Sequence, residues 1–335
     1  MRSWKSRIRP GPDARKTIAH AHLERTEVIM KRRELLKKSA AFGFVTALPF
    51  STASELNAVS QPAVPPADIH PLKPPDKGMI PVAFVISAGA VVIDFCGPWE
   101  VFQDVIVPGT MGTSAFDLYT VGETLDPIKA SGGLQIVPDH TFQTAPQPKV
   151  IVIPAQNNSS PAMLDWIRKA SKNADLTMSV CTGAIVLANT GLLAGKTATT
   201  HHDSYRTMAL QYPDIHIQRG ARFVDDGHLA SSGGLSSGID LAFHVVERYY
   251  GRDLATLTAY RMEYQGKGWQ NPDSNVAYAP IPTGTAEHPL CPVCWMKLSK
   301  DMAMPVEYQG KTLYFCSQAH IDLFMASPAK FLNAK

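Results

Sequence analysis

Residues 176–195, "LTMSVCTGAIVLANTGLLAG", join a strand pattern directly to a helix pattern. A short strand-like run leads into Cys181, and a Gly- and Ala-rich helical pattern follows, capped at its C-terminus by Gly191. A residue at such a turn meets the free N–H groups and the positive dipole end of the helix. Both favour the thiolate form of Cys181, which attacks electrophiles, and so predict a nucleophile. A buried structural thiol is the alternative.

Strands alternate with helices on both sides of this stretch. Strands are predicted at residues 79–86, 116–122, 148–155 and 176–180. Helices are predicted at residues 161–172, directly after Cys181, and at residues 236–251. Residues 222–234 are predicted to form a hairpin. This alternation predicts an α/β domain with a mostly parallel sheet that is covered on both faces. Ligands bind such sheets beyond the C-terminal strand ends, and Cys181 falls at one of those ends.

Positive charge is concentrated at the N-terminus. The 335 residues carry 32 Lys and Arg against 29 Asp and Glu, a net charge of +3. Residues 1–38 have a surplus of eight positive charges, so the rest of the chain carries −5. A body of negative net charge argues against binding to nucleic acid, which is recognised through clustered Lys and Arg.

The basic N-terminus resembles a twin-arginine export signal. Arg32 and Arg33 precede Leu35 and Leu36, and an apolar segment at 40–50 is followed by small residues. The apolar segment at 40–50 is too short to span a bilayer of roughly 30 Å. We therefore expect a signal peptide within residues 1–58 and export to the periplasm by the twin-arginine machinery. A basic amphipathic surface helix is the alternative. Met30 is an alternative start, because residues 1–29 add nothing to a targeting pattern.

Two further stretches divide the chain. Residues 59–78 are rich in proline and lack apolar periodicity, which predicts a linker, and residues 268–287 form a weaker boundary of the same kind. The expected organisation is therefore a domain at 79–267 and a C-terminal module at 288–335, each preceded by a linker.

Several motifs recur in an order that resembles the ThiJ/PfpI superfamily. They are "DFCGP", "CTGA", "GLLAGKTATTH", "RFVDDG" and "GGLSSGIDLA", all within residues 79–267. The Cys-Thr-Gly turn and the Asp-x-x-Gly-Pro segment resemble the isonitrile hydratase branch, which also includes amidase-like domains of AraC-type regulators. The resemblance implies a flavodoxin-like three-layer α/β/α sandwich, no cofactor in this domain, a small carbon–nitrogen substrate and a homodimer.

The resemblance also implies roles for individual residues. Cys181 matches the nucleophile, and Thr182 matches the hydroxyl residue that contacts the substrate. Asp94 matches an acid that faces the thiol and shares a proton with it, which suits proton delivery to a substrate carbon. A helix cap is the alternative role for Asp94. The nearby Cys96 departs from the family pattern, and we expect that it could form a disulfide with Cys181 in an oxidising compartment.

The remaining site residues follow from the same resemblance. Ala155 and Gln156 occupy the place of a Gly-Gly pair whose N–H groups stabilise an oxyanion, and Gly183 belongs to the same group around the substrate. His201 matches a histidine at the mouth of the site, with structural packing as the alternative. Asp240 matches a recurrent family position and lies in the first turn of its helix, where we expect a structural role.

The C-terminal module has metal-ligand spacing. Cys291 and Cys294 form a C-x₂-C pair, and Cys316 with His320 forms a C-x₃-H pair on one helix face. The order of motifs resembles the YHS domain, a small module that binds heavy metals, with Trp295 at a position where glycine is common. We expect an α+β fold that binds zinc or copper. Two disulfides or loose thiols are the alternative.

Two functions of different classes fit these observations. One is an exported cysteine-dependent hydratase or hydrolase, indicated by Cys181, Thr182 and Asp94 together. The other is a non-catalytic periplasmic protein that binds a ligand or metal, favoured by the altered loop at Ala155 and by the metal module. A regulatory sensor domain is a third reading, less favoured because an export signal precedes the domain.

Overall fold

The structure is a computed structural model that describes residues 71–110, 112–157 and 159–332. The expected signal peptide and the first part of the proline-rich stretch lie outside these residues. Within them, no helix is both long enough and apolar enough to cross a membrane.

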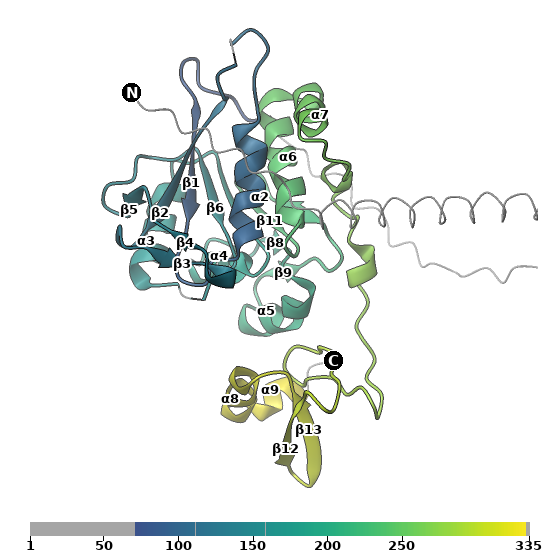
Figure 1. The fold of residues 1–335 in the computed structure, drawn as a ribbon. Helices are drawn as coiled ribbons and strands as arrows, with labels where there is room; N and C mark the ends of the chain where they lie inside the picture. The colour runs from purple at the N-terminus through teal and green to yellow at the C-terminus, as the bar shows by residue number, and fades with distance from the viewer. Residues whose placement is uncertain (1–70, 111, 158, 333–335) are drawn as a thin grey trace, which may run out of the picture. The chain divides into compact units, whose positions relative to one another are not determined.

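A seven-stranded sheet forms the centre of the main domain (Figure 1). In spatial order its strands are β10 (Phe223–Asp225), β11 (Leu229–Ser232), β7 (Leu176–Val180), β6 (Val150–Ile153), β1 (Ile80–Val85), β2 (Phe116–Gly122) and β5 (His140–Thr141). All neighbours pair in parallel except β10 and β11, which form the predicted hairpin. The mostly parallel sheet is therefore confirmed, and the predicted strands match within a few residues.

Helices cover both faces of this sheet. They are α2 (Val92–Gln103), α6 (Ser237–Tyr250) and α7 (Arg252–Arg261) on one face, and α3 (Pro161–Ser171), α4 (Gly183–Asn189) and α5 (Tyr205–Gln211) on the other. In Figure 1, α2 and α6 run side by side. Successive residues of one strand point to opposite faces, so Val152 joins the core under α2 and α6 while Ile151 and Ile153 join the other.

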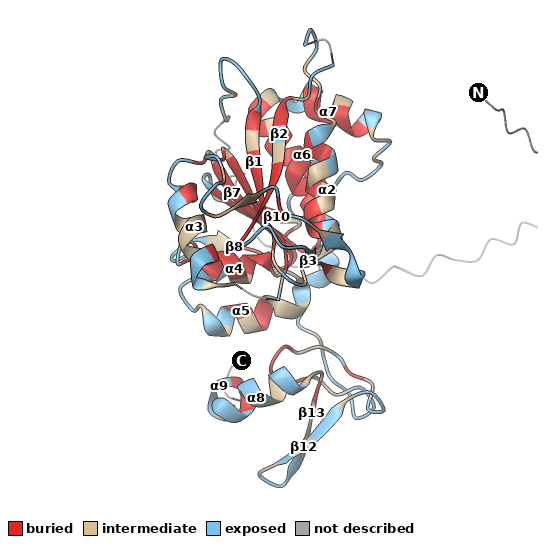
Figure 2. Cartoon of the chain, turned by 60° about the vertical axis from the view of Figure 1, so that its left-hand side comes forward, coloured by how far each residue is buried: buried red, intermediate tan, exposed pale blue. Residues whose placement is uncertain are grey.

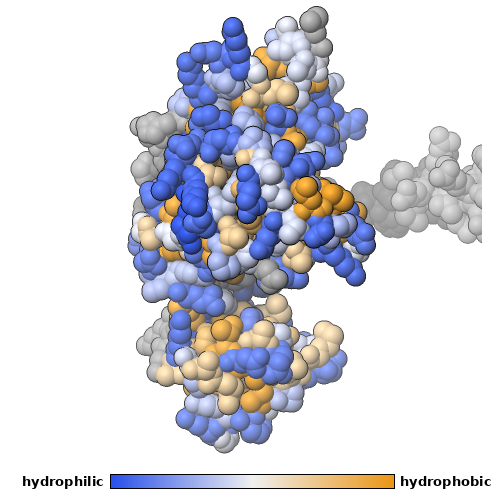
Figure 3. Space-filling model, turned by 90° about the vertical axis from the view of Figure 1, so that its left-hand side faces the viewer, coloured by the Kyte–Doolittle hydropathy of each residue, from blue (hydrophilic) through white to orange (hydrophobic). Residues whose placement is uncertain are grey.

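This arrangement confirms the three-layer α/β/α sandwich. Figure 2 shows that burial is concentrated in the strands and in the sheet-facing sides of the helices. The face of the main domain in Figure 3 is mostly hydrophilic, with apolar side chains scattered over it, as is normal for a protein surface. Two short pairs complete the domain: β3 (Ile128–Lys129) with β4 (Gln135–Ile136), and β8 (Thr197–Ala198) with β9 (His216–Ile217).

The segment expected as a second linker packs on the main domain over its first part. It contains the short helices η3 (Gly268–Gln270) and η4 (Val276–Tyr278), and both Trp269 and Asn275 are buried. Its polar and proline-rich composition indicates a linker, but a single buried tryptophan is enough to fix the chain. The stretch therefore extends the main domain beyond residue 267.

The C-terminal module is a small α+β unit, as predicted. Strands β12 (Met304–Tyr308) and β13 (Lys311–Phe315) form an antiparallel hairpin, followed by α8 (Gln318–Ala326) and α9 (Pro328–Leu332). Its core contains only a few apolar side chains, centred on Phe315 and Phe324, together with Cys291 and Cys294. A core of this size gives limited stability, so a bound metal would add substantially to it.

Candidate functional site

The predicted nucleophile lies at a sharp turn between β7 and α4. Cys181 has a backbone φ of 57°, in the left-handed region that residues with a side chain rarely adopt. The first residue of α4, Gly183, lies so close to the end of β6 that an added Cβ atom would be 2.2 Å from the carbonyl oxygen of Ile153. Glycine at position 183 thus allows α4 to pack against the end of β6. This role differs from the direct contact with substrate that was expected.

Asp94 lies on α2 and is completely buried. Its Oδ2 accepts a hydrogen bond from the Ala155 N–H at 3.1 Å, and its Oδ1 has no hydrogen-bond partner among the described residues. Burial raises the pKa of Asp94 to about 7, although the hydrogen bond from Ala155 opposes this. The carboxyl group therefore holds or releases a proton near neutral pH. Although Asp94 lies in the first turn of α2, its carboxylate accepts the Ala155 N–H, outside the helix, which argues against the alternative of a helix cap.

The expectation of a thiolate at Cys181 is wrong for the free site. Burial, followed by the nearby charge of Asp94, raises the pKa of Cys181 to about 11. Hydrogen bonds from the N–H groups of Leu235 and Thr182 and from the Thr182 hydroxyl oppose this rise without overcoming it. Desolvation outweighs the dipole of a helix that has only seven residues. The charge of Asp94 contributes to this rise, so the acid acts electrostatically on the thiol, and the sharing of a proton between them stays a prediction.

The predicted oxyanion donors are arranged differently from the expectation. The Ala155 N–H is occupied by Asp94, and the Gln156 side chain donates to the Val85 carbonyl at 3.3 Å. Two other N–H groups act on the Cys181 sulfur, that of Thr182 and that of Leu235, which lies in a segment that sequence reasoning did not select. The sequence feature that could have pointed to Leu235 is the "GGL" run, whose two glycines allow a tight turn. Leu235 itself has a φ of 48°.

A cavity of about 180 Å³ adjoins this group. It is lined by Thr200, His201, Arg222, Leu235 and neighbouring residues, while Cys181 lies behind the wall with 7% of its surface exposed. His201 therefore lines the cavity beside Cys181, and desolvation by burial is the main reason that its pKa is lowered.

No disulfide joins Cys96 to Cys181. All five cysteines of the chain, which the described residues include, are free thiols. Cys96 is partly buried on α2, and burial followed by the charge of Glu100 raises its pKa.

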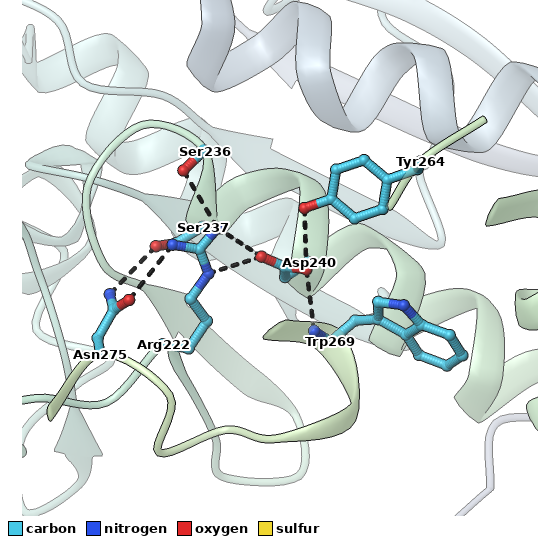
Figure 4. A network of polar contacts seen from close by, with 7 residues as sticks. All are labelled: Arg222, Ser236, Ser237, Asp240, Tyr264, Trp269 and Asn275. Carbon is cyan, nitrogen blue, oxygen red and sulfur yellow. Dashed lines mark hydrogen bonds and ion pairs between the residues drawn. The ribbon is translucent and has the colours of Figure 1, made fainter. Parts of the chain in front are cut away.

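A polar network supports one wall of the cavity (Figure 4). The buried Asp240 carboxylate accepts hydrogen bonds from Arg222 Nε at 2.6 Å, from the Tyr264 hydroxyl at 3.1 Å and from the Trp269 N–H at 2.9 Å. Arg222 also donates to Asn275 at 3.3 Å. Asp240 thus has the structural role that was expected, and it fixes the Arg222 guanidinium group where it lines this cavity.

The C-terminal cluster has the geometry of a metal site. The sulfur of Cys316 lies 3.7 Å from that of Cys294 and 3.8 Å from that of Cys291, and Cys291 Sγ lies 3.7 Å from His320 Nδ1. Bonds of roughly 2.3 Å to a tetrahedral ion place neighbouring sulfurs about 3.8 Å apart. Three thiol sulfurs and one imidazole nitrogen therefore fit Zn²⁺ or Cu⁺. All four predicted ligands are brought together.

Two details of this cluster differ from the sequence-based expectation or go beyond it. Cys316 lies between β13 and α8 rather than on the helix, because Ser317 caps α8 by accepting the His320 N–H at 3.3 Å. Trp295 has a φ of 63°, which explains why glycine suits this position. Its ring instead stacks under the Arg206 guanidinium of α5, 3.8 Å from the ring centre.

Both parts of the described chain match known families. Residues 81–248 match the DJ-1/PfpI family and residues 291–335 match the YHS domain. An isonitrile hydratase from Pseudomonas putida is 34% identical over 192 residues, which cover 55% of this chain and 78% of that protein. The transcriptional regulator CdhR of Pseudomonas aeruginosa is 28% identical over 133 residues, 38% of this chain and 39% of the regulator.

One solved structure supports the same assignment. A ThiJ/PfpI family protein from Pseudomonas syringae matches with a TM-score of 0.51 and 26% sequence identity. The match covers 63% of this chain and 85% of the chain of that protein. Together with the sharp turn at Cys181 and the match over residues 81–248, these findings mean that the chain belongs to the DJ-1/PfpI family and carries a C-terminal YHS domain.

Proposed function

We propose that the main domain is an isonitrile hydratase-like enzyme that converts a small isonitrile into an N-formamide, with Cys181 as the nucleophile. The observation that carries this proposal is the buried pair of Cys181 and Asp94, in which one carboxyl oxygen has no other partner among the described residues. The similarity to an isonitrile hydratase supports the substrate class. A terminal isonitrile carbon is slender and unhindered, which suits a thiol with 7% exposure.

The first step adds the S–H group across the isonitrile carbon. Asp94 takes the proton of the Cys181 thiol, whose raised pKa keeps it protonated until a base accepts the proton. The sulfur attacks the terminal carbon, and Asp94 then delivers the same proton to that carbon. The product is a thioimidate, R–N=CH–S–, whose sulfur is that of Cys181. The N–H of Leu235 is positioned to stabilise negative charge on the sulfur.

The second step uses one water molecule. Its oxygen attacks the thioimidate carbon while Asp94 transfers a water proton to the nitrogen, giving R–NH–CH(OH)–S. The carbon–sulfur bond then breaks, the hydroxyl proton returns through Asp94 to Cys181, and R–NH–CHO leaves. The sum is one isonitrile plus one water giving one formamide, and Asp94 is suited to both transfers because its pKa is about 7.

The experiment is hydration of an alkyl isonitrile labelled with ¹³C at the terminal carbon, followed by NMR. We expect a formyl signal with the wild type and none with Cys181→Ala, while Cys96→Ala, which removes another thiol on α2, behaves like the wild type. A formyl signal that persists in Cys181→Ala would exclude the proposal.

A ligand-binding protein without catalysis is the second candidate. It is favoured by the raised pKa of Cys181 and by the use of the Ala155 N–H for Asp94 rather than for an oxyanion. Similarity to a transcriptional regulator points the same way. If the wild type binds isonitriles or amides in calorimetry but produces no formamide, this candidate replaces the enzyme.

For the C-terminal module we propose binding of Zn²⁺ or Cu⁺ by Cys291, Cys294, Cys316 and His320. The mutual distances of their ligand atoms support it. Elemental analysis of the purified protein tests it, with Cys291→Ser as the comparison, since loss of one buried thiol should lower the metal content by the ion that this cluster holds.

We also propose twin-arginine export to the periplasm, on the pattern around Arg32 and Arg33, and a homodimer, as in relatives. Fractionation of cells expressing the chain, with Arg32→Lys/Arg33→Lys as control, tests export. Light scattering of the purified protein tests the dimer.

A further inference from the structure

A second group of metal-ligand atoms lies apart from the cysteine cluster. The imidazoles of His201 and His202 and the carboxylate of Asp203 place one ligand atom each within 4.8 Å of one another. His202 Nε2 is 3.3 Å from Asp203 Oδ1, and His201 Nδ1 is 3.7 Å from Asp203 Oδ2. Two imidazoles and one carboxylate suit Zn²⁺, Cu²⁺ or another divalent transition metal, and leave coordination positions open.

The local fold holds these three side chains in a fixed arrangement. His201 is the N-cap of the 3₁₀ turn η2 (His202–Ser204), and its Nδ1 accepts a hydrogen bond from the Asp203 N–H at 3.3 Å. The ring of His202 stacks on Tyr278, with 4.7 Å between ring centres and 28° between planes, and it lies 4.3 Å from the ring of His201. Ordered ligands lose less conformational entropy when an ion binds, which favours binding.

The group borders two cavities. His201 and His202 line the cavity of about 180 Å³ next to Cys181. His202 and Asp203 also line a second cavity, of about 230 Å³, whose wall includes Cys294 of the cysteine cluster. At about 30 Å³ for each water molecule, the second cavity has room for a hydrated ion between the two groups of ligands.

Contacts between α5 and the C-terminal module involve Trp295, which also lines this second cavity. The described residues of both parts belong to one compact unit. Arg206 of α5 lies over the ring of Trp295, and its Nη2 donates to the Phe331 carbonyl at 2.6 Å. Arg206 is buried, and it is close enough for the charges of Cys291 and Cys294 to act on it.

We propose that His201, His202 and Asp203 form a second site for a divalent transition-metal ion, separate from the four-ligand cluster of the C-terminal module. The site borders both the cavity next to Cys181 and the cavity whose wall includes Cys294. The proposal requires that this site binds metal even when the cysteine cluster cannot.

The test uses the full chain without an affinity tag and Co²⁺ as the probe. A variant with Cys291→Ser, Cys294→Ser and Cys316→Ser removes the thiolate ligands, and His202→Gln with Asp203→Asn removes the second site. His216→Gln, at an exposed histidine on β9, is the matched control. Both altered ligands of the second site are partly exposed, so we expect folding to be retained, and circular dichroism checks it.

We expect the wild type to bind two Co²⁺ ions and to show thiolate-to-cobalt charge transfer from the first. The serine variant should bind one ion without that band, and adding His202→Gln and Asp203→Asn should abolish this binding, while His216→Gln should not. The proposal is overturned if the serine variant binds no cobalt, or if it still binds one ion after the second pair of changes. Absence of the charge-transfer band in the wild type would count against the cysteine cluster alone.

Discussion

Replacement of Asp94 by asparagine tests the buried carboxyl group through the stability of the protein. The folded state raises the pKa of Asp94 from 3.8 to about 7, because the side chain is completely buried. Between those values the folded state binds more protons than the unfolded state, so the free energy of unfolding falls as the pH rises. A rise of about 3 pKa units corresponds to about 4 kcal/mol, lost in full above pH 7.

The asparagine side chain of the Asp94→Asn variant has no proton to lose, and its amide oxygen can still accept the Ala155 N–H. We therefore expect the free energy of unfolding of Asp94→Asn, measured relative to the wild type, to increase by about 4 kcal/mol between pH 4 and pH 8. Urea unfolding followed by tryptophan fluorescence measures it, since Trp99 lies on the same helix. Asp126→Asn, at an exposed carboxylate, is the control. A difference that does not change with pH would refute the argument that burial sets the protonation of Asp94.

Three further predictions concern packing and metal binding. Gly183→Ala should lower the free energy of unfolding by about 3 kcal/mol or more, measured by denaturant titration, because its Cβ would overlap a backbone carbonyl oxygen. Trp295→Gly should relieve about 1 kcal/mol of backbone strain but lose about 2 kcal/mol of stacking with Arg206, so limited proteolysis should cut the C-terminal module faster. A chelator should lower the melting temperature of the wild type more than that of Cys291→Ser, because only the wild type has the complete ligand set of the cysteine cluster.

The sequence predicted the framework of the sheet well for a physical reason. Strands buried on both faces must be apolar throughout, so runs such as residues 80–85 and 150–153 are visible without a structure. Cys181 and its neighbours were predictable because a strand, a small-residue turn and a helix follow one another directly. The four metal ligands were predictable because their spacing is part of the local fold.

The parts that could not be predicted depend on contacts between distant segments. Whether the Ala155 N–H is free depends on a carboxylate 61 residues away, and the protonation of Cys181 depends on how deeply the packed domain buries it. Leu235 reaches the sulfur through its backbone, so its side-chain type carries no signal. Trp269 lies in a stretch whose composition is that of a linker, although it is 3% exposed.

The catalytic pair is tested by the rate of formamide production at pH 7, measured for the wild type, Cys181→Ala and Asp94→Asn. The proton transfers assigned to Asp94 predict that Asp94→Asn lowers kcat by about 10² to 10⁴-fold, and that Cys181→Ala gives no product. Mass spectrometry of the wild type should find a thioimidate on the peptide that contains Cys181. Unchanged turnover in Asp94→Asn, or an adduct on any other cysteine with Cys181 unmodified, would contradict the claim that these two side chains act as one catalytic pair.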